Sequence, residues 1–415
     1  MNEVRNILIG FEFRPDKSQI CYYDRKMQDA ISLVVKAGSS EYEFPTVLAK
    51  KKEEDLWKVG EEAQKLEEND DWYLIKDLYF RMEEGKNLLL DGRDYPVFEI
   101  MEQYLKASLE MLGVPEVLDK LRGIMITCPE LKKKMVNHLR ETCKGLGLAN
   151  GKFLLCDFEE SFYYHTLCQR SELWNRKVAL FQFQKNVVSY ADLTLNPKSR
   201  PMTVLRKQGE VLELSEDKEK RDGQFYEFIG KCFQNQLYSS VFIVGEGFSQ
   251  TWAAKSILLL CKNHRKVFYG NNLFAKGACL AIKEKLEDHK LKGYLYEGKD
   301  FVKSNIGMEM TIAGARSYYP LVSAGSNWYE VEKECEFLLD DTQELVFLVQ
   351  NLKEQEEKKF SLTLTNLPKR PNKTTKIHLS LSFELPGKCR IVAKDMGFGE
   401  LFKSSGQIWT ETLDL

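Results

Sequence analysis

Cysteine and histidine are the residue types most often used for metal binding and nucleophilic catalysis, and their spacing in this chain supports neither. The 10 cysteines run from Cys21 to Cys389 without a Cys-x-x-Cys pair, and the 5 histidines are scattered. Zinc sites need closely spaced Cys and His ligands, and hydrolases of the zincin or nucleophile-elbow type need motifs that are absent here. Most cysteines lie in apolar runs such as residues 125–130 (MITCPE), so we expect reduced, buried thiols.

The elements that would position a site follow from hydrophobic periodicity. Strands are expected over 7–13, 18–23, 30–35, 44–50, 57–59, 123–127, 153–156, 177–183, 187–195, 202–205 and 240–244. Helices are expected from Glu61 past Gln64 and over 96–112, 130–144, 159–169, 223–236, 252–261 and 277–287. Strand clusters followed by strand–helix units therefore occur twice. This pattern predicts an α/β protein with two halves that face a cleft.

The character of the sequence changes near Gly293, where helical periodicity disappears. Strand-like runs then follow at short spacing, over 308–312, 329–338, 344–348, 359–365, 376–383 and 389–394. Turn signals such as Asn366-Leu367-Pro368 separate them. The pattern predicts a small β-sandwich or barrel, with the charged segment 287–292 as the connection and a last strand-like segment near the end of the chain.

Charge and hydropathy exclude several classes of partner. Lys and Arg number 60 against 62 Asp and Glu, which gives no electrostatic case for nucleic acid. The first residues lack the features of a signal peptide, and the longest later apolar run, 257–260, is far too short to span a membrane. We therefore expect a cytoplasmic protein that binds neither nucleic acid nor membrane.

Several stretches resemble, in order along the chain, the DnaK-type heat-shock proteins of the sugar-kinase/heat-shock/actin superfamily. They are IGFEF (9–13), FPTVL (44–48), VGEEA (59–63), residues 126–148, FEESFYYHTL (158–167), FIVGEGF (242–248), NNLFAKGACLAI (271–282) and residues 360–400. The chain also resembles an uncharacterised bacterial family with this same pair of domains. The resemblance covers nearly the whole chain, and it is the order of the matches that makes it specific.

The resemblance implies a two-lobed actin-like ATPase fold, built of duplicated ribonuclease-H-like halves, over residues 1–290. Lobe I would cover about 1–175 and lobe II about 176–290. A β-sandwich that resembles the DnaK substrate-binding domain would follow over 291–415, without the helical lid of that family.

The same resemblance implies roles for individual residues. Glu160 takes the place of the family's water-orienting Glu, and Lys76 lies near the place of its catalytic Lys. The positions implied for ATP and magnesium are Glu12, Lys17, Ser18, Gln182, Gly245, Gly247 and Phe248, with no metal site built from protein ligands alone. Each has a plainer interpretation: a helix charge for Glu160, a surface Lys for Lys76, and a tight strand–helix turn for Gly245 and Gly247.

The phosphate loops depart from the family pattern, in which glycine-rich turns direct backbone N–H groups at phosphate. The first turn, residues 14–17, has no glycine, and Pro15 has no N–H to donate. In the second loop Gln182 replaces the usual Asp, while Gln184 and Lys185 bring side chains to the place of phosphate. Because each lost donor costs roughly 10²–10³-fold in rate, we expect little hydrolysis. Because Gln182 is neutral, we also expect ATP and magnesium binding to be weak or absent.

These observations favour a chaperone-like protein-binding or scaffold protein with a degenerate nucleotide-binding module, a pseudo-ATPase whose partners are other proteins. The alternative is an active ATP-hydrolysing chaperone with divergent loops, in which Glu12, Lys76 and Glu160 carry the reaction and Lys17 contacts phosphate. Magnesium-dependent ATP turnover separates the two. An actin-like filament former and a sugar kinase fit less well, because neither gives the β-rich tail a role.

Overall fold

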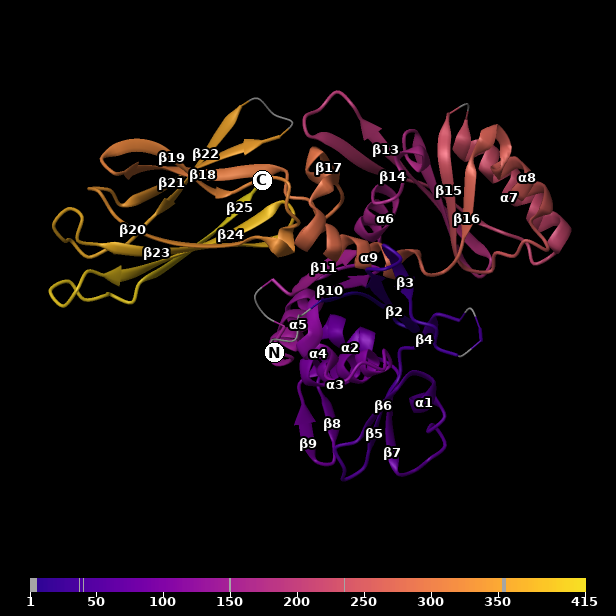
Figure 1. The fold of residues 1–415 in the computed structure, drawn as a ribbon. Coiled ribbons are helices and arrows are strands. Elements are labelled where there is room, and N and C mark those ends of the chain that lie inside the picture. The colour runs from indigo at the N-terminus through magenta and orange to yellow at the C-terminus, as the bar shows by residue number, and fades with distance from the viewer. Residues whose placement is uncertain (1–5, 37, 40, 149–150, 235, 353–355) are drawn as a thin grey trace. The chain divides into compact units, whose positions relative to one another are not determined.

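Two units make up the chain in the computed structural model, which describes residues 6–415 apart from 37, 40, 149–150, 235 and 353–355. The first unit extends to Tyr296 and is mixed α/β, and the second, Glu297–Leu415, is built of strands (Figure 1). The expected change of character near residue 293 is therefore confirmed. The physical basis of this change is the spacing of buried residues, which includes helical periods before this point and follows the two-residue period of strands after it.

The first sheet of unit one has β1 at its centre. Its strands are β1 (Ile7–Phe13), β2 (Lys17–Asp24), β3 (Asp29–Ser32), β4 (Glu43–Pro45), β10 (Leu121–Cys128) and β11 (Phe153–Asp157). Their order is β11-β10-β1-β2-β3, and β4 pairs with β2. β1 runs antiparallel to β2 and parallel to β10. Six of the seven β1 residues are buried, as expected of a near-continuous apolar strand covered on both faces.

The second sheet repeats this arrangement. Its strands are β12 (Lys177–Gln184), β13 (Val187–Asn196), β14 (Met202–Glu213), β15 (Tyr238–Glu246), β16 (Lys266–Tyr269) and β17 (Tyr294–Glu297). The order is β16-β15-β12-β13-β14-β17, with β12 antiparallel to β13 and parallel to β15. Leaving aside the edge strand β17, the five strands have the order and directions of the first sheet. The prediction of two similar α/β halves is thus confirmed.

Equivalent helices follow equivalent strands in the two sheets. α5 (Lys133–Gly145) follows β10 as α8 (Ala254–Leu260) follows β15, and α6 (Phe158–Leu167) follows β11 as α9 (Leu273–Lys283) follows β16. In the second half α7 (Lys218–Phe233) connects β14 to β15. α5, α6 and α8 lie within three residues of their expected ranges, whereas α7 begins five residues before its expected start and α9 is displaced by four residues toward the N-terminus.

Helices α6 and α9 each pack on the sheet of the other half. Phe158 and Phe162 of α6 join a core cluster with Leu180 of β12, whereas Ala278 of α9 packs with Leu8 of β1. The backbones approach each other so closely at two positions that only glycine fits there. A Cβ on Gly10 would lie 2.3 Å from the Ala275 carbonyl oxygen, and one on Gly277 would lie 2.1 Å from that of Ser161. The exchanged helices tie the two halves together at one place.

A small subdomain is inserted between β3 and β10. It contains β5 (Leu48–Lys51), β6 (Trp57–Val59), α1 (Gly60–Gln64), β7 (Trp72–Ile75), α2 (Leu78–Glu84), β8 (Leu88–Leu90), β9 (Arg93–Tyr95), α3 (Val97–Glu110) and α4 (Val117–Lys120). The single strand expected over 44–50 is broken into β4 and β5, because Thr46 N donates to Asp16 O at 3.0 Å between them. Helix α1 ends at Gln64, contrary to the expected continuation, since tighter turns follow in which Leu66 N donates to Ala63 O.

The second unit consists of two four-stranded antiparallel sheets. The first has the order β19-β18-β21-β22, formed by β18 (Ser304–Ile312), β19 (Ala315–Val322), β21 (Glu344–Asn351) and β22 (Glu357–Thr363). The second has the order β20-β23-β24-β25, formed by β20 (Glu332–Leu338), β23 (Lys376–Leu385), β24 (Lys388–Gly397) and β25 (Ile408–Asp414). Alternate residues of β23 and β24 are buried, so this sheet is covered on one face.

A buried carboxylate fixes the last turn of this unit. Asp395 accepts two hydrogen bonds of 2.8 Å from the Arg370 guanidinium and others from Gly397 N and Ser405 N. These donors hold the pKa of Asp395 far below its ordinary value. The turn therefore depends on side chains that are distant in sequence.

Short helical turns complete the chain: η1 (Ser171–Leu173), η2 (Lys262–His264), η3 (Glu284–Asp288), η4 (Lys290–Gly293) and η5 (Trp328–Glu330). The charged segment expected as the connection, 287–292, lies in η3 and η4 and precedes β17, which still belongs to the second sheet. Among the described residues, no helix combines the length and the apolar character needed to cross a membrane.

Candidate functional site

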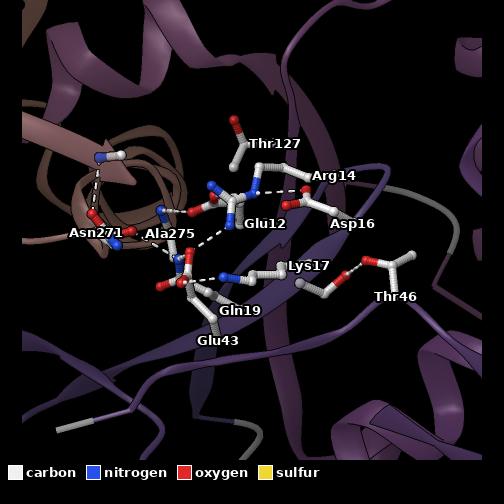
Figure 2. A network of polar contacts seen from close by, with 12 residues as sticks. Glu12, Arg14, Asp16, Lys17, Gln19, Glu43, Thr46, Thr127, Asn271 and Ala275 are labelled. Atoms are coloured by element: carbon white, nitrogen blue, oxygen red, sulfur yellow. Dashed lines mark hydrogen bonds and ion pairs between the residues drawn. The ribbon is translucent and has the colours of Figure 1, made fainter. Parts of the chain in front are cut away.

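Glu12 is the buried centre of a polar network at the end of β1 (Figure 2). Its Oε2 accepts a hydrogen bond of 3.1 Å from Ala275 N in the first turn of α9, where the helix dipole favours an anion. Burial raises the pKa of Glu12 from its ordinary 4.5 to about 7, Arg14 lowers it, and Glu43 raises it further. A buried acid of this kind changes its charge near neutral pH.

Arg14 provides the positive charge of the network. Its Nε lies 3.4 Å from Glu12 Oε1 and 3.7 Å from Asp16 Oδ1, and its guanidinium donates to Glu43. Burial would lower the pKa of Arg14, but Glu12, Glu43 and Asp16 together raise it above its ordinary value. The side chain is only 19% exposed, so Arg14 is a fixed internal cation among three carboxylates.

Two contacts join this network to the second half of the unit. Lys17 at the start of β2 forms ion pairs with Glu43, at 3.4 Å, and with Glu246 at the end of β15. Gln19 Nε2 donates to the Asn271 carbonyl at 2.7 Å, and the Asn271 side chain accepts from Gly245 N at 2.8 Å. The pairing with Lys17 lowers the pKa of Glu246. Residues from both sheets therefore converge beside Arg14.

The second hairpin turn, Gln184–Asn186, is engaged with the protein itself. Lys185 N donates to Glu246 O at 2.7 Å, and its carbonyl accepts from Arg221. Added Cβ atoms on Gly245 and Gly247 would lie 1.9 Å from the carbonyl oxygens of Phe183 and Lys185. These two glycines are therefore required where the turn passes the neighbouring hairpin.

Aromatic rings fill the space behind this second hairpin. Phe248 packs 5.4 Å from Phe183 and 5.7 Å from Trp252, measured between ring centroids, and Phe225 completes the cluster. Phe248 is 6% exposed. Gln182 is half-buried on β12, where its carbonyl accepts a weak hydrogen bond of 3.5 Å from Ser189 Oγ. Phe248 thus lies in a core rather than on an open surface.

The structure separates the remaining predicted residues. Ser18 is buried and contacts Thr46 Oγ1 at 3.0 Å and Tyr104 Oη at 2.8 Å. Glu160 is buried in the first turn of α6, and its Oε1 lies 3.4 Å from Lys285 Nζ.

Lys76 is exposed in the inserted subdomain and pairs with Glu67. Of the predicted residues, Glu12 and Lys17 belong to the Arg14 network, whereas neither Glu160 nor Lys76 has a described contact with it.

Sequence reasoning did not assign Arg14, Glu43 or Asn271 to the site. Arg14 was seen only as part of a turn without glycine. One signal was available for it, since residues two apart on a strand share a face and Arg14 follows Glu12 by two. No local signal identifies Glu43 or Asn271, because Glu43 meets Arg14 and Lys17, and Asn271 meets Gln19, only when distant segments come together.

Comparison with known proteins gives two matches, and both are to families without an assigned role. Residues 29–299 match the family described as "Family of unknown function (DUF5716) C-terminal". Residues 301–415 match "Domain of unknown function (DUF8552)". No curated protein matches the chain. Within the described part of the chain, no group of three or more His, Cys, Asp or Glu side chains is arranged to hold a metal ion.

Proposed function

Because the chain belongs to the DUF5716 family of unknown function, its role must be inferred from its own residues, and we propose that it is a protein-binding scaffold with a degenerate nucleotide-binding module. In this proposal unit one is an actin-like fold of the DnaK type that neither holds nor hydrolyses ATP effectively. Unit two is a β-sandwich that contacts other proteins. The proposed setting is the cytoplasm, in keeping with ten cysteines that all lie among the described residues and are free.

The topology of unit one supports the actin-like assignment. The two sheets share one strand order, and equivalent helices follow their equivalent strands. A duplicated ribonuclease-H-like fold requires this arrangement. Helices α6 and α9, which are exchanged between the sheets, coincide with two of the stretches that carry the resemblance, 158–167 and 271–282. Since fold alone does not determine function, the activity must be argued from the site.

The internal cation Arg14 is the observation that carries the proposal. In an ATPase of this superfamily the acidic residue at Glu12 would hold hydrated magnesium. Here the Arg14 guanidinium already pairs with Glu12, Asp16 and Glu43 at hydrogen-bonding or ion-pair distance. A magnesium ion would have to displace a buried guanidinium, so ATP with magnesium does not fit the residues present.

The hairpin turns supply few donors for phosphate. Pro15 has no N–H, and Arg14 N donates to Lys17 O at 3.2 Å across the first turn. In the second turn Lys185 N is engaged by Glu246 O. Without converging free N–H groups, neither turn can surround phosphate oxygens in the manner of a phosphate loop.

Exposed apolar side chains of unit two support the protein-binding half of the proposal. Those more than 45% exposed include Tyr318, Leu352, Leu385, Leu401 and Ile408. Exposed apolar surface is typical of protein-binding sites, and edge strands such as β19 and β22 can accept an added strand from a partner.

The first test is calorimetric titration of the full chain with ATP and magnesium, together with a phosphate-release assay. We expect no binding stronger than about 1 mM and no turnover above that of a buffer control. Micromolar binding with magnesium-dependent turnover would instead establish the alternative, an active ATPase. In that case Glu160→Gln should abolish turnover, while Lys76→Met distinguishes a catalytic Lys from a surface one.

The second test measures protein binding directly. The full chain is added to a test protein, such as reduced insulin, whose aggregation is followed by light scattering. We expect aggregation to be suppressed equally with and without ATP. A chain that leaves aggregation unchanged would contradict the chaperone-like role, and suppression that depends on ATP would contradict the pseudo-ATPase assignment.

A further inference from the structure

A separate cavity of about 250 Å³ lies in unit one, away from the Arg14 network. The residues that matter for its chemistry are Asp29, His165, Gln169, Phe242, Phe268 and Lys276. They come from β3, α6 and the segment after it, β15, β16 and α9. The cavity is therefore assembled from both halves of the unit, and it contains none of the residues proposed for ATP.

Aromatic rings form one wall of this cavity. Phe242 and Phe268 are stacked with centroids 5.1 Å apart and planes 18° apart, and the His165 ring meets Phe242 edge-on at 5.3 Å. Phe268 lies on the sheet edge and is 40% exposed, although it is a large apolar residue. Such a wall favours a planar ring, which gains both apolar contact and ring–ring geometry.

His165 supplies an unsatisfied polar group. Its Nδ1 is buried and has no hydrogen-bond partner among the described residues. Burial, helped by the charge of Lys276, lowers the pKa of His165 to about 4, so the imidazole is neutral at pH 7 and carries one donor and one acceptor. A buried polar nitrogen without a partner costs free energy.

The charges around the cavity favour an anion. Lys276 is half-buried on α9, and the described ion pairs leave its ammonium without a carboxylate partner. Asp29 is exposed at the rim, where water and salt screen its charge. The interior field is therefore dominated by the lysine.

We propose that this cavity binds a small aromatic carboxylate. The ring packs against the Phe242–Phe268 wall, the carboxylate pairs with Lys276, and a ring substituent or carboxylate oxygen bonds to His165. The volume suits a single substituted ring, because a cavity of roughly 150 Å³ holds benzene and drug-sized ligands need about 300 Å³ or more. Binding here is independent of ATP, so the proposal does not depend on the function proposed above.

The test titrates the full chain with benzoate and follows binding by ligand-observed NMR and calorimetry. We expect a dissociation constant of about 1 mM or below. Two matched probes separate the interactions: benzamide lacks the charge, and cyclohexanecarboxylate lacks the aromatic ring. Each should bind at least about 10-fold more weakly than benzoate if both the lysine and the aromatic wall contribute.

Variants then locate the site. Lys276→Gln should weaken benzoate about 10-fold or more and leave benzamide unchanged, whereas Lys276→Arg should retain binding. Lys255→Gln, an exposed lysine on α8, is the control and should have no effect. If Lys276→Gln does not fold, Phe268→Leu at the exposed edge gives a second measurement. This variant should weaken the binding of both benzoate and benzamide.

Three outcomes would overturn the proposal. They are no benzoate binding at about 10 mM, equal binding of benzamide, or unchanged affinity in both Lys276→Gln and Phe268→Leu. Any of these would mean that the cavity does not select an aromatic carboxylate.

Discussion

The hairpins β1–β2 and β12–β13 occupy the same position in two sheets of the same strand order, yet they are filled in opposite ways. The first carries Glu12 and Arg14 in a buried ionic network. The second carries Gln182 in place of the acid and packs Phe183 into a cluster of rings. Shared topology therefore fixes where a strand ends, but not the chemistry at its end.

This difference has energetic consequences. A packed ring stabilises the fold through the volume that it fills, and its loss leaves a cavity. A buried ionic group stabilises the fold only while every partner is present, because a charge left alone in the interior is costly. The second hairpin should thus be sensitive to side-chain size, and the first to charge and pH.

The largest effect is expected in the aromatic cluster. Phe183→Ala removes a ring that is 1% exposed and should lower the free energy of unfolding by about 4 kcal/mol, measured by urea denaturation. The control Tyr226→Ala, at a residue of α7 that is 40% exposed, should change it by less than about 0.5 kcal/mol. A small effect at Phe183 would mean that the rings are not a close-packed core.

Removing the internal cation should have the next largest effect. Arg14→Met leaves the buried Glu12 without its counter-charge and leaves Glu43 with Lys17 alone, and we expect a loss of about 3 kcal/mol in the same denaturation experiment. Adding Glu12→Gln to Arg14→Met should restore much of the loss, since the stranded buried charge is then removed. Arg316→Met, which breaks an ion pair whose arginine is 78% exposed, serves as control and should cost under about 0.5 kcal/mol.

The pH dependence isolates Glu12. Its pKa is about 7 in the folded protein against 4.5 ordinarily, so the folded state binds more protons between these values. Stability conferred by Glu12 is therefore complete below about pH 4.5 and is lost as the pH rises through 7. Relative to Glu12→Gln, the chain should lose about 2.5 kcal/mol of unfolding free energy between about pH 5 and pH 8. Parallel pH profiles of the two proteins would contradict a buried, uncharged Glu12.

The smallest effect is expected for the ion pair that joins the halves. Lys17 is 33% exposed and Glu246 is 52% exposed, so solvent screens their attraction. A double-mutant cycle with Lys17→Ala and Glu246→Ala should give a coupling of about 0.5 kcal/mol, which decreases as salt is added. A coupling above about 2 kcal/mol would show that this contact, rather than the exchanged helices, holds the halves together.

Much of the fold could be predicted from the sequence because periodicity is a local property. The ranges of β1 and β6 were predicted residue for residue, and that of α3 agrees closely with its element. β16, β17 and β19 were not predicted. They are short or edge strands with few fully buried residues, so no continuous apolar run or clean alternation marks them.

The candidate site was predicted only in part. Glu12 and Lys17 were identified through a resemblance along the chain, and both lie in the network. Arg14 was read as a turn residue, because a sequence does not reveal that its side chain turns inward to meet Glu43. The cavity beside His165 could not be predicted either, since it depends on three-dimensional packing between two halves of the chain.

The sequence by itself determined the apolar strands, the duplicated order of strands and helices, and the absence of glycine from the two hairpin turns, residues 14–17 and 184–186. These depend on residue type and short-range spacing. Only the tertiary structure decided that Arg14 lies within ion-pair distance of three carboxylates and that Lys185 N is already engaged. These ion pairs and hydrogen bonds form between residues that are distant in sequence and meet only in the folded chain. Their energies depend on how deeply the packing of sheets and helices buries the charged and polar groups.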